Sequence, residues 1–276
     1  MEDFIMRTKI LTGMMCLFSL MLFITPAIPQ ENGGDKDYDK FRISLGWFNP
    51  RAETTLRLDA SNSDLGTTLR LEDDVGLSKG NGLFRADGFY RFKKRHRIDF
   101  GYYDFDRSGT QTITGEIDFG DEVFPIDARV NSFFDIEIIK ISYTYLIIAK
   151  PNMTVGASIG FNISDVTFGL SAETMPIART VGASLPLPVL GLNGIYHLGS
   201  NFWLEAHVQY FYIDLGSVDG SILDARVAIN YRIKKNFGIG IGYNVFSVRA
   251  SKENPDFTGR FKLKYDGAQI FASLFF

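Results

Sequence analysis

The segment from Asp266 to Phe276, at the end of the sequence, constrains the fold more than any other. Apolar residues occupy every second position from Ala268 to Phe276, and Gly267, Gln269 and Ser273 stand among the residues between them. Because successive side chains of a strand point to opposite faces, this pattern predicts a β-strand with one apolar face. In a membrane barrel that face would contact lipid and the other would face the lumen. A half-buried sheet of a soluble protein would give the same alternation.

The same alternation recurs along most of the chain. It is clear in 41–47, 139–145, 155–162 and 223–232. Aromatic residues gather where these segments end at short turns, and amphipathic rings prefer a membrane interface. The breadth of the pattern therefore favours a membrane barrel over a soluble sheet. The aromatics concerned are Tyr90, Phe92, Tyr145, Tyr196, Trp203, Tyr231 and Phe237.

Short turns alternate with longer polar stretches, which is the asymmetry of an up-and-down barrel with short periplasmic turns. Counting strands from this rhythm predicts an all-β fold: a closed antiparallel transmembrane barrel of ten strands, with eight and twelve as alternatives. Two stretches between strands could form hairpins of their own, 54–59 with 67–72 and 110–119 with 122–130. The predicted strands are 40–49, 82–93, 95–109, 132–148, 152–165, 186–198, 201–214, 221–233, 236–250 and 260–276.

The beginning of the chain has the pattern of a secretory signal peptide. Arg7 and Lys9 precede an apolar run over 10–24, and Thr25-Pro26-Ala27 follows. This pattern predicts a signal peptide over 1–27 and a barrel domain over 28–276. A retained membrane anchor is the alternative. Cys16 is the sole cysteine and lies within that run, so the mature chain would have no thiol or disulfide.

Composition excludes other classes. No second apolar run approaches the length of a spanning helix and the mean hydropathy is 0.00, so a helical membrane protein is excluded. The formal net charge is −3, which argues against nucleic-acid binding. Nothing in the sequence indicates a cofactor or a metal site.

Charged residues alternate with the apolar ones, so strand parity places them in the lumen. Ionised groups in a narrow barrel must be paired or hydrated, and their mixed signs predict a structural ion-pair network. Small barrels are nearly filled by side chains, while inward glycines could leave a local cavity. The predicted lumenal network consists of Arg85, Asp87, Asp99, Lys140, Glu205, His207, Asp224 and Arg226, with Arg42, Arg91 and Arg232 also placed inside.

Candidate catalytic residues are few. His96 and His197 lie at turns, and His207 shares a strand face with Glu205, an arrangement that could move protons but more often belongs to a buried polar network. No Gly-x-Ser-x-Gly motif and no zinc-type histidine pair is present. We therefore expect no catalytic residue and no enzyme.

The stretch 104–129 is strongly acidic. It could bind divalent cations, but solvated loop carboxylates are the simpler interpretation.

The signal, the hairpin rhythm, the segments 189–196 and 238–244 and the terminal Phe276 together resemble bacterial outer-membrane β-barrel proteins, in particular small OmpA-, OmpX- and OmpW-type barrels. The resemblance implies a location in the outer membrane, with outer-membrane lipid, lipopolysaccharide and the outer-membrane assembly machinery as partners. It also implies that Phe276 is a C-terminal assembly signal. The expected function is a structural or surface-interaction barrel with a largely plugged lumen. The alternatives are a narrow channel for small or apolar solutes and an outer-leaflet lipid or peptide hydrolase.

Overall fold

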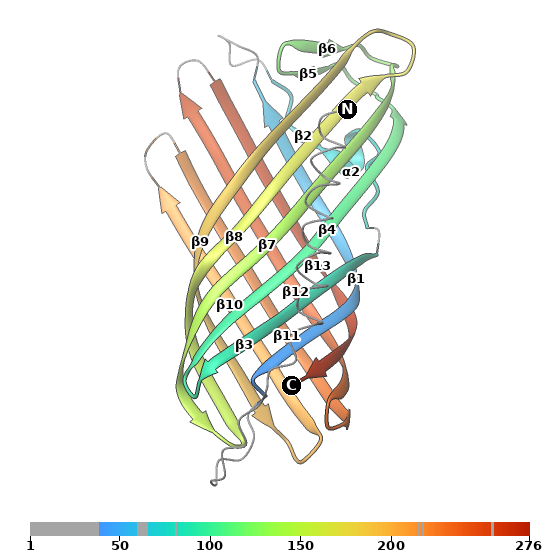
Figure 1. The fold of residues 1–276 in the computed structure, drawn as a ribbon. Helices are drawn as coiled ribbons and strands as arrows, with labels where there is room; N and C mark the ends of the chain where they lie inside the picture. Colours follow the sequence, from blue (N-terminus) through green and yellow to red (C-terminus); the bar gives the residue numbers. More distant parts are fainter. Residues whose placement is uncertain (1–38, 60–65, 81, 215, 217, 255–256) are drawn as a thin grey trace, which may run out of the picture. The chain divides into compact units, whose positions relative to one another are not determined.

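The chain forms a closed barrel in which ten long antiparallel strands follow one another in sequence order (Figure 1). The structure is a computed structural model, and it describes residues 39–59, 66–80, 82–214, 216, 218–254 and 257–276. The predicted signal peptide over 1–27 lies outside these residues. The barrel strands are β1 (Phe41–Leu58), β3 (Leu83–Lys93), β4 (His96–Thr112), β7 (Arg129–Lys150), β8 (Met153–Ala172), β9 (Ala178–His197), β10 (Phe202–Asp214), β11 (Val218–Lys234), β12 (Phe237–Asn254) and β13 (Phe257–Phe275).

The barrel closes between its first and last strands. β1 pairs with β13 along its whole length, from Arg42 opposite Phe275 to Leu58 opposite Gly259. The predicted closed antiparallel barrel of ten strands is confirmed, and every predicted strand corresponds to an observed one. The four short turns lie at one end of the barrel, called here the turn end, and the longer connections lie at the loop end.

Several strands continue past their predicted ends toward the loop end. β1 runs nine residues beyond the predicted Asn49, and β8 runs to Ala172 instead of 165. Outward side chains become polar in these extensions, so the apolar alternation used for the prediction stops there. The backbone ladder does not depend on side-chain polarity, and it continues.

The two extra hairpins differ in outcome. β5 (Ile117–Phe119) and β6 (Glu122–Phe124) pair around Gly120, whose φ of 62° suits a tight turn, so the core of the second hairpin is confirmed. The first forms only in part. β2 (Leu69–Arg70) pairs with Thr55 and Leu56, and the chain then turns into the short helix α2 (Leu71–Asp74) instead of continuing as a strand.

The connection from β2 through α2 to β3 folds inward and closes the loop end. Leu69, Leu71, Val75 and Leu77 are each at most 2 % exposed. They belong to a continuous apolar cluster with inward side chains of β1, β4, β7, β8 and β13. Hydrogen bonds tie the connection to the wall: the Ala52 amide donates to the Lys79 carbonyl, and the Ser132 hydroxyl donates to the Val75 carbonyl. We call residues 66–80 the inner plug.

One seam of the wall lacks a hydrogen-bond ladder. β9 and β10 pair only from His197 opposite Trp203 to Leu190 opposite Tyr210. Beyond that point β9 stays paired with β8 as far as Ala178, and β10 stays paired with β11 as far as Asp214. Pro186 and Pro188 lie on the separated part of β9, where their missing N–H groups suit an edge without a partner. We call this stretch the β9–β10 seam.

Candidate functional site

The turn-end half of the lumen holds a chain of ion pairs that crosses the barrel. Arg42 makes two hydrogen bonds of 2.6 Å to the Glu205 carboxylate, and Arg226 Nη2 lies 3.3 Å from the same group. Arg226 also reaches Asp87 at 3.1 Å, and Asp87 accepts from Arg85 at 2.6 and 3.0 Å. The chain joins β1 and β10 to β11 and β3, which are not all neighbours in the sheet, so it braces the barrel across its interior.

A second branch starts from the same arginine. Arg85 Nη1 donates to Asn244 at 2.7 Å, and Asn244 donates to Asp224 at 2.8 Å. Lys140 forms a buried ion pair with Asp224, and His207 Nε2 lies 3.7 Å from that carboxylate. Asp224 is therefore contacted from three sides, which suits an ionised carboxylate that is removed from bulk water.

A third group lies nearer the turns. Arg97 lies 2.9 Å from the Asp99 carboxylate, which accepts from Thr144 at 2.5 Å, and Arg97 also donates to Asn193 at 3.0 Å. The guanidinium carbons of Arg42 and Arg97 each lie 4.8 Å from the centre of the Phe89 ring. A polar cavity of about 80 Å³ remains among these side chains, which is room for a few water molecules.

All eight residues predicted for the lumenal network lie in these three groups. The first two groups are joined through Arg85, and Asp99 belongs to the third. Glu205 and His207 share a strand face as expected but contact different partners, arginines for Glu205 and Asp224 for His207. Arg91 is also buried in the lumen, and Arg232 pairs with Asp39 at the turn end. Three further residues contact this network and were not predicted: Arg97, Asn193 and Asn244. Strand parity alone would have placed them inside.

Apolar side chains and one buried ion pair fill the loop-end half of the lumen. Arg107 is fully buried and lies 2.5 Å from Glu72 of the inner plug, and its Nη2 donates to Thr54 Oγ1 at 2.6 Å. Its guanidinium stacks 5.0 Å from the Phe105 ring centre and 4.8 Å from that of Phe134. This side chain ties the plug to the wall. The pair could not be predicted from strand parity, because Glu72 lies on a connection between barrel strands.

Between the two halves, aromatic rings cross the lumen. The hydroxyls of Tyr103 and Tyr265 meet in a hydrogen bond, and the Tyr265 ring stacks on Phe246 with centroids 4.7 Å apart. Nearer the turns, Phe271 packs against Gly240: a Cβ at Gly240 would lie 2.4 Å from the Phe271 ring. The inward glycine there admits a bulky neighbour instead of opening a cavity.

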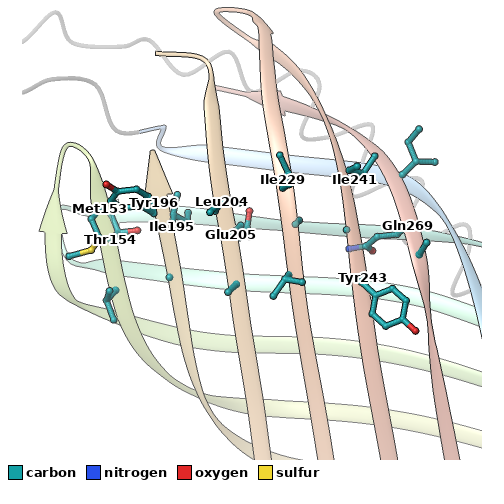
Figure 2. A pocket seen from close by; sticks show the side chains of 18 of the residues that line it. Met153, Thr154, Ile195, Tyr196, Leu204, Glu205, Ile229, Ile241, Tyr243 and Gln269 are labelled. Carbon is teal, nitrogen blue, oxygen red and sulfur yellow. The ribbon is translucent and has the colours of Figure 1, made fainter. Parts of the chain in front are cut away.

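The outer face carries a continuous apolar band. One row of outward-facing cross-strand partners crosses eight strands, and Figure 2 labels its members from Met153 to Ile241. The row consists of Met153, Tyr196, Leu204, Ile229, Ile241, Ile270, Trp47 and Phe84. On β8 the band extends from Met153 to Ile163. At about 3.3 Å per residue and a strand tilt of about 40°, this stretch spans about 25 Å, the height of a lipid-facing band.

The position of Trp203 was assigned wrongly, and the acidic stretch 104–129 is a loop only in part. Trp203 is 3 % exposed and points into the lumen, where its ring lies 5.6 Å from that of Phe275. Parity on β10 decides this, because Leu204 beside it faces outward. Asp104 and Asp106 belong to β4 and project from the outer wall, so the acidic stretch is not entirely a loop.

The three histidines singled out by the sequence lie in two parts of the barrel. His96 and His197 lie at the turn end and His207 lies in the lumen, so none of the chain's three histidines is near the loop end. Among the described residues, no group of three or more His, Cys, Asp or Glu side chains could hold a metal ion. No helix within the described part of the chain is both long and apolar enough to cross a membrane.

Comparison with known proteins identifies the fold. No model of a known protein family matches the sequence, and no curated protein matches it. The chain is similar to the outer membrane protease OmpT from Escherichia coli, with a TM-score of 0.56 and 10 % identity over 90 % of this chain and 100 % of that one. It also matches the translocator domain of the autotransporter NalP from Neisseria meningitidis, with a TM-score of 0.49 and 10 % identity over 88 % of this chain and 90 % of that one. The chain has the fold of the bacterial outer-membrane barrels.

Proposed function

We propose that this outer-membrane-type β-barrel serves in the outer membrane as a structural or surface-interaction protein and not as an enzyme. The observation that carries the proposal is the filling of the lumen at both ends. Ion-paired side chains cross the turn-end half, and the inner plug with its apolar cluster fills the loop-end half. A barrel filled in this way offers a rigid outer face and loop end for contact, while its interior is occupied.

The proposed orientation places the turn end in the periplasm and the loop end outside the cell. Short turns face the periplasm in barrels of this kind, and longer loops face outward. Phe276 would then lie at the periplasmic rim, where the Phe41 carbonyl accepts from its amide. This position supports its proposed role as the signal for the assembly machinery, and the apolar band supports lipid as the surrounding partner.

Planar-bilayer recording of the purified protein tests the proposal, together with fractionation of cells that express it. We expect recovery in the outer membrane and no steady conductance. A stable open channel in the wild-type protein would overturn the structural role. Recovery of the folded protein from the soluble periplasm would overturn the location as well.

A second function, a narrow route for apolar solutes, is favoured by the β9–β10 seam. Leu187 and Phe211, which flank the seam, point inward and pack against the apolar cluster. A solute could pass between that cluster and the membrane if the strands separate there. Replacing Pro186 and Pro188 by Val would restore two N–H donors and favour closure of the ladder. Transfer of an apolar dye into vesicles that carry wild-type protein, and its loss in this double variant, would support the route over the structural role.

A further inference from the structure

A patch of positive charge lies on the outer wall near the loop end, where β12, β13 and β1 run side by side. Its members are all exposed and belong to strands, so their backbone positions are fixed by the ladder. Two acids, Glu53 and Asp266, share this surface, and Asp266 accepts a hydrogen bond from Tyr243. We call this surface the basic patch; it consists of Arg51, Arg249, Arg260, Lys262 and Lys264.

The patch contains like charges in direct opposition. Arg249 and Lys262 are cross-strand partners on the outer face, a pairing that costs stability unless an anion lies between or above them. Within the described part of the chain, neither Arg249 nor Lys262 forms an ion pair, and Lys264 forms none either. Arg249 and Lys262 thus face each other without an ion-pair partner, and Lys264 lies opposite Glu53 across the β1–β13 ladder without forming an ion pair with it.

The height of the patch on the barrel places it at the membrane surface. On β12 the outward residues Ile241, Tyr243 and Val245 are followed by Ser247 and then Arg249. The apolar band therefore ends one or two outward positions below the patch. Tyrosine is typical of this boundary, since its ring is apolar and its hydroxyl is polar.

On the opposite wall, the charged outward residues that the structure describes at the same height are acids. The hydroxyls of Tyr103 and Tyr265 meet inside the lumen, so these two residues lie at about the same height. Their sequence neighbours on the outer face are Asp104 on β4 and Lys264 on β13. The two walls are thus at one level. Cations are concentrated on one side of the barrel, and the acids on the other are cross-strand neighbours: Asp104, Asp106, Asp135, Glu137 and Asp165.

We propose that the basic patch binds the phosphate groups of lipids in the outer leaflet, lipopolysaccharide in particular. The inference rests on the proposed location in the outer membrane. Lys and Arg both bind phosphate, and Arg can do so through two parallel hydrogen bonds. The patch faces sideways at headgroup height, directly above lipid-facing side chains, so a lipid can place its acyl chains on the band and its phosphate on the patch. A soluble polyanion would contact the basic patch but not the apolar band.

The test compares two variants that lose the same charge from different surfaces. One carries Arg249→Gln, Lys262→Gln and Lys264→Gln. The matched control carries Lys93→Gln, Lys94→Gln and Arg95→Gln at the exposed β3–β4 turn. Full mature protein in zwitterionic detergent is titrated with purified lipopolysaccharide and with dephosphorylated lipopolysaccharide, and bound lipid is counted by native mass spectrometry. Folding is checked by retained mobility in unheated SDS gels.

We expect at least a tenfold loss of lipopolysaccharide affinity in the patch variant, little change in the control, and weak binding of the dephosphorylated lipid by wild type. Binding to wild type should also fall as salt rises, because salt screens the attraction. Should the triple variant fail to fold, Lys262→Gln alone and the salt dependence of wild type carry the test.

Equal affinities of wild type, patch variant and control would overturn the proposal. Equally tight binding of a soluble sulfated polysaccharide by wild type would assign the patch to a soluble partner instead, and would also overturn it. Fractionation separates this failure from that of the proposed function. A protein found in the outer membrane whose patch variant binds lipid normally refutes only the patch.

Discussion

Replacing Glu205 should destabilise the barrel more than any change to a loop carboxylate. Glu205 is the acceptor for both Arg42 and Arg226, and the side chains of these arginines are 8 % and 5 % exposed. Glu205→Ala would leave two poorly solvated guanidinium groups facing each other across the site. Removing one partner of a buried pair costs about 3–5 kcal/mol where burial is complete.

The expected loss of unfolding free energy in Glu205→Ala lies at the lower end of that range. The cavity of about 80 Å³ beside Glu205 can admit a few waters, and Arg226 retains its bond of 3.1 Å to Asp87. We therefore expect a loss of about 3 kcal/mol. With a urea m-value of about 1–3 kcal/mol per molar, the unfolding midpoint should fall by about 1 M or more.

The assay is urea unfolding of the refolded protein in detergent, followed by tryptophan fluorescence. Asp121→Ala is the matched control, because Asp121 is half exposed and lies 3.9 Å from Arg179. Pairs of that kind contribute about 0–1 kcal/mol. Glu205→Gln, which keeps the shape and loses the charge, should fall between the two.

Coincident midpoints for Glu205→Ala and Asp121→Ala would refute a structural role for the network. A rise in planar-bilayer conductance of Glu205→Ala without loss of stability would show instead that these side chains gate a pore. Asp87→Ala should behave as Glu205→Ala does, because Asp87 holds Arg85 and Arg226 together.

Three further outcomes follow from other parts of the molecule. Deleting Phe276 should reduce the amount of folded protein recovered from the outer membrane, and normal recovery would remove its role as an assembly signal. Arg107→Ala should loosen the inner plug, since it leaves Glu72 buried without its cation; added protease should then cleave within 66–80 faster than in wild type, and an unchanged rate would contradict the anchoring role. Amides at the β9–β10 seam, within 178–189, should exchange with deuterated water faster than those of β7, and equal protection would show that the ladder closes in solution.

Much of the architecture follows from sequence alone, because a strand that faces lipid on one side and a lumen on the other must alternate. The period of two placed Phe41, Ile43, Leu45 and Trp47 outside, and it placed the charges of the network inside. Turn residues located the four short turns. Where the outward side chains become polar, as beyond Asn49, the pattern vanished although the ladder continues.

The contents of the lumen were decided by the tertiary structure. Parity states that Arg42 and Glu205 face inward, but strand stagger and barrel closure set them at one height and make them partners. The same holds for Tyr103 and Tyr265, whose hydroxyls meet although 162 residues separate them. No local pattern records such a pairing, since it depends on how all ten strands are tilted and staggered around the barrel.

The inner plug and the basic patch show the same division. Residues 66–80 are tied to the wall by Arg107, and their inward fold arises because Leu69, Leu71 and Val75 gain burial in an interior that the strands create. The basic patch gathers cations from the first strand and from the last two. Sequence alone determined the strands of the barrel wall, which of their side chains face outward, and which end carries the short turns. These features depend on the local period of the backbone and on turn residues. Its interior partners and its charged outer surface required closure, which brings residues far apart in the chain to the same height.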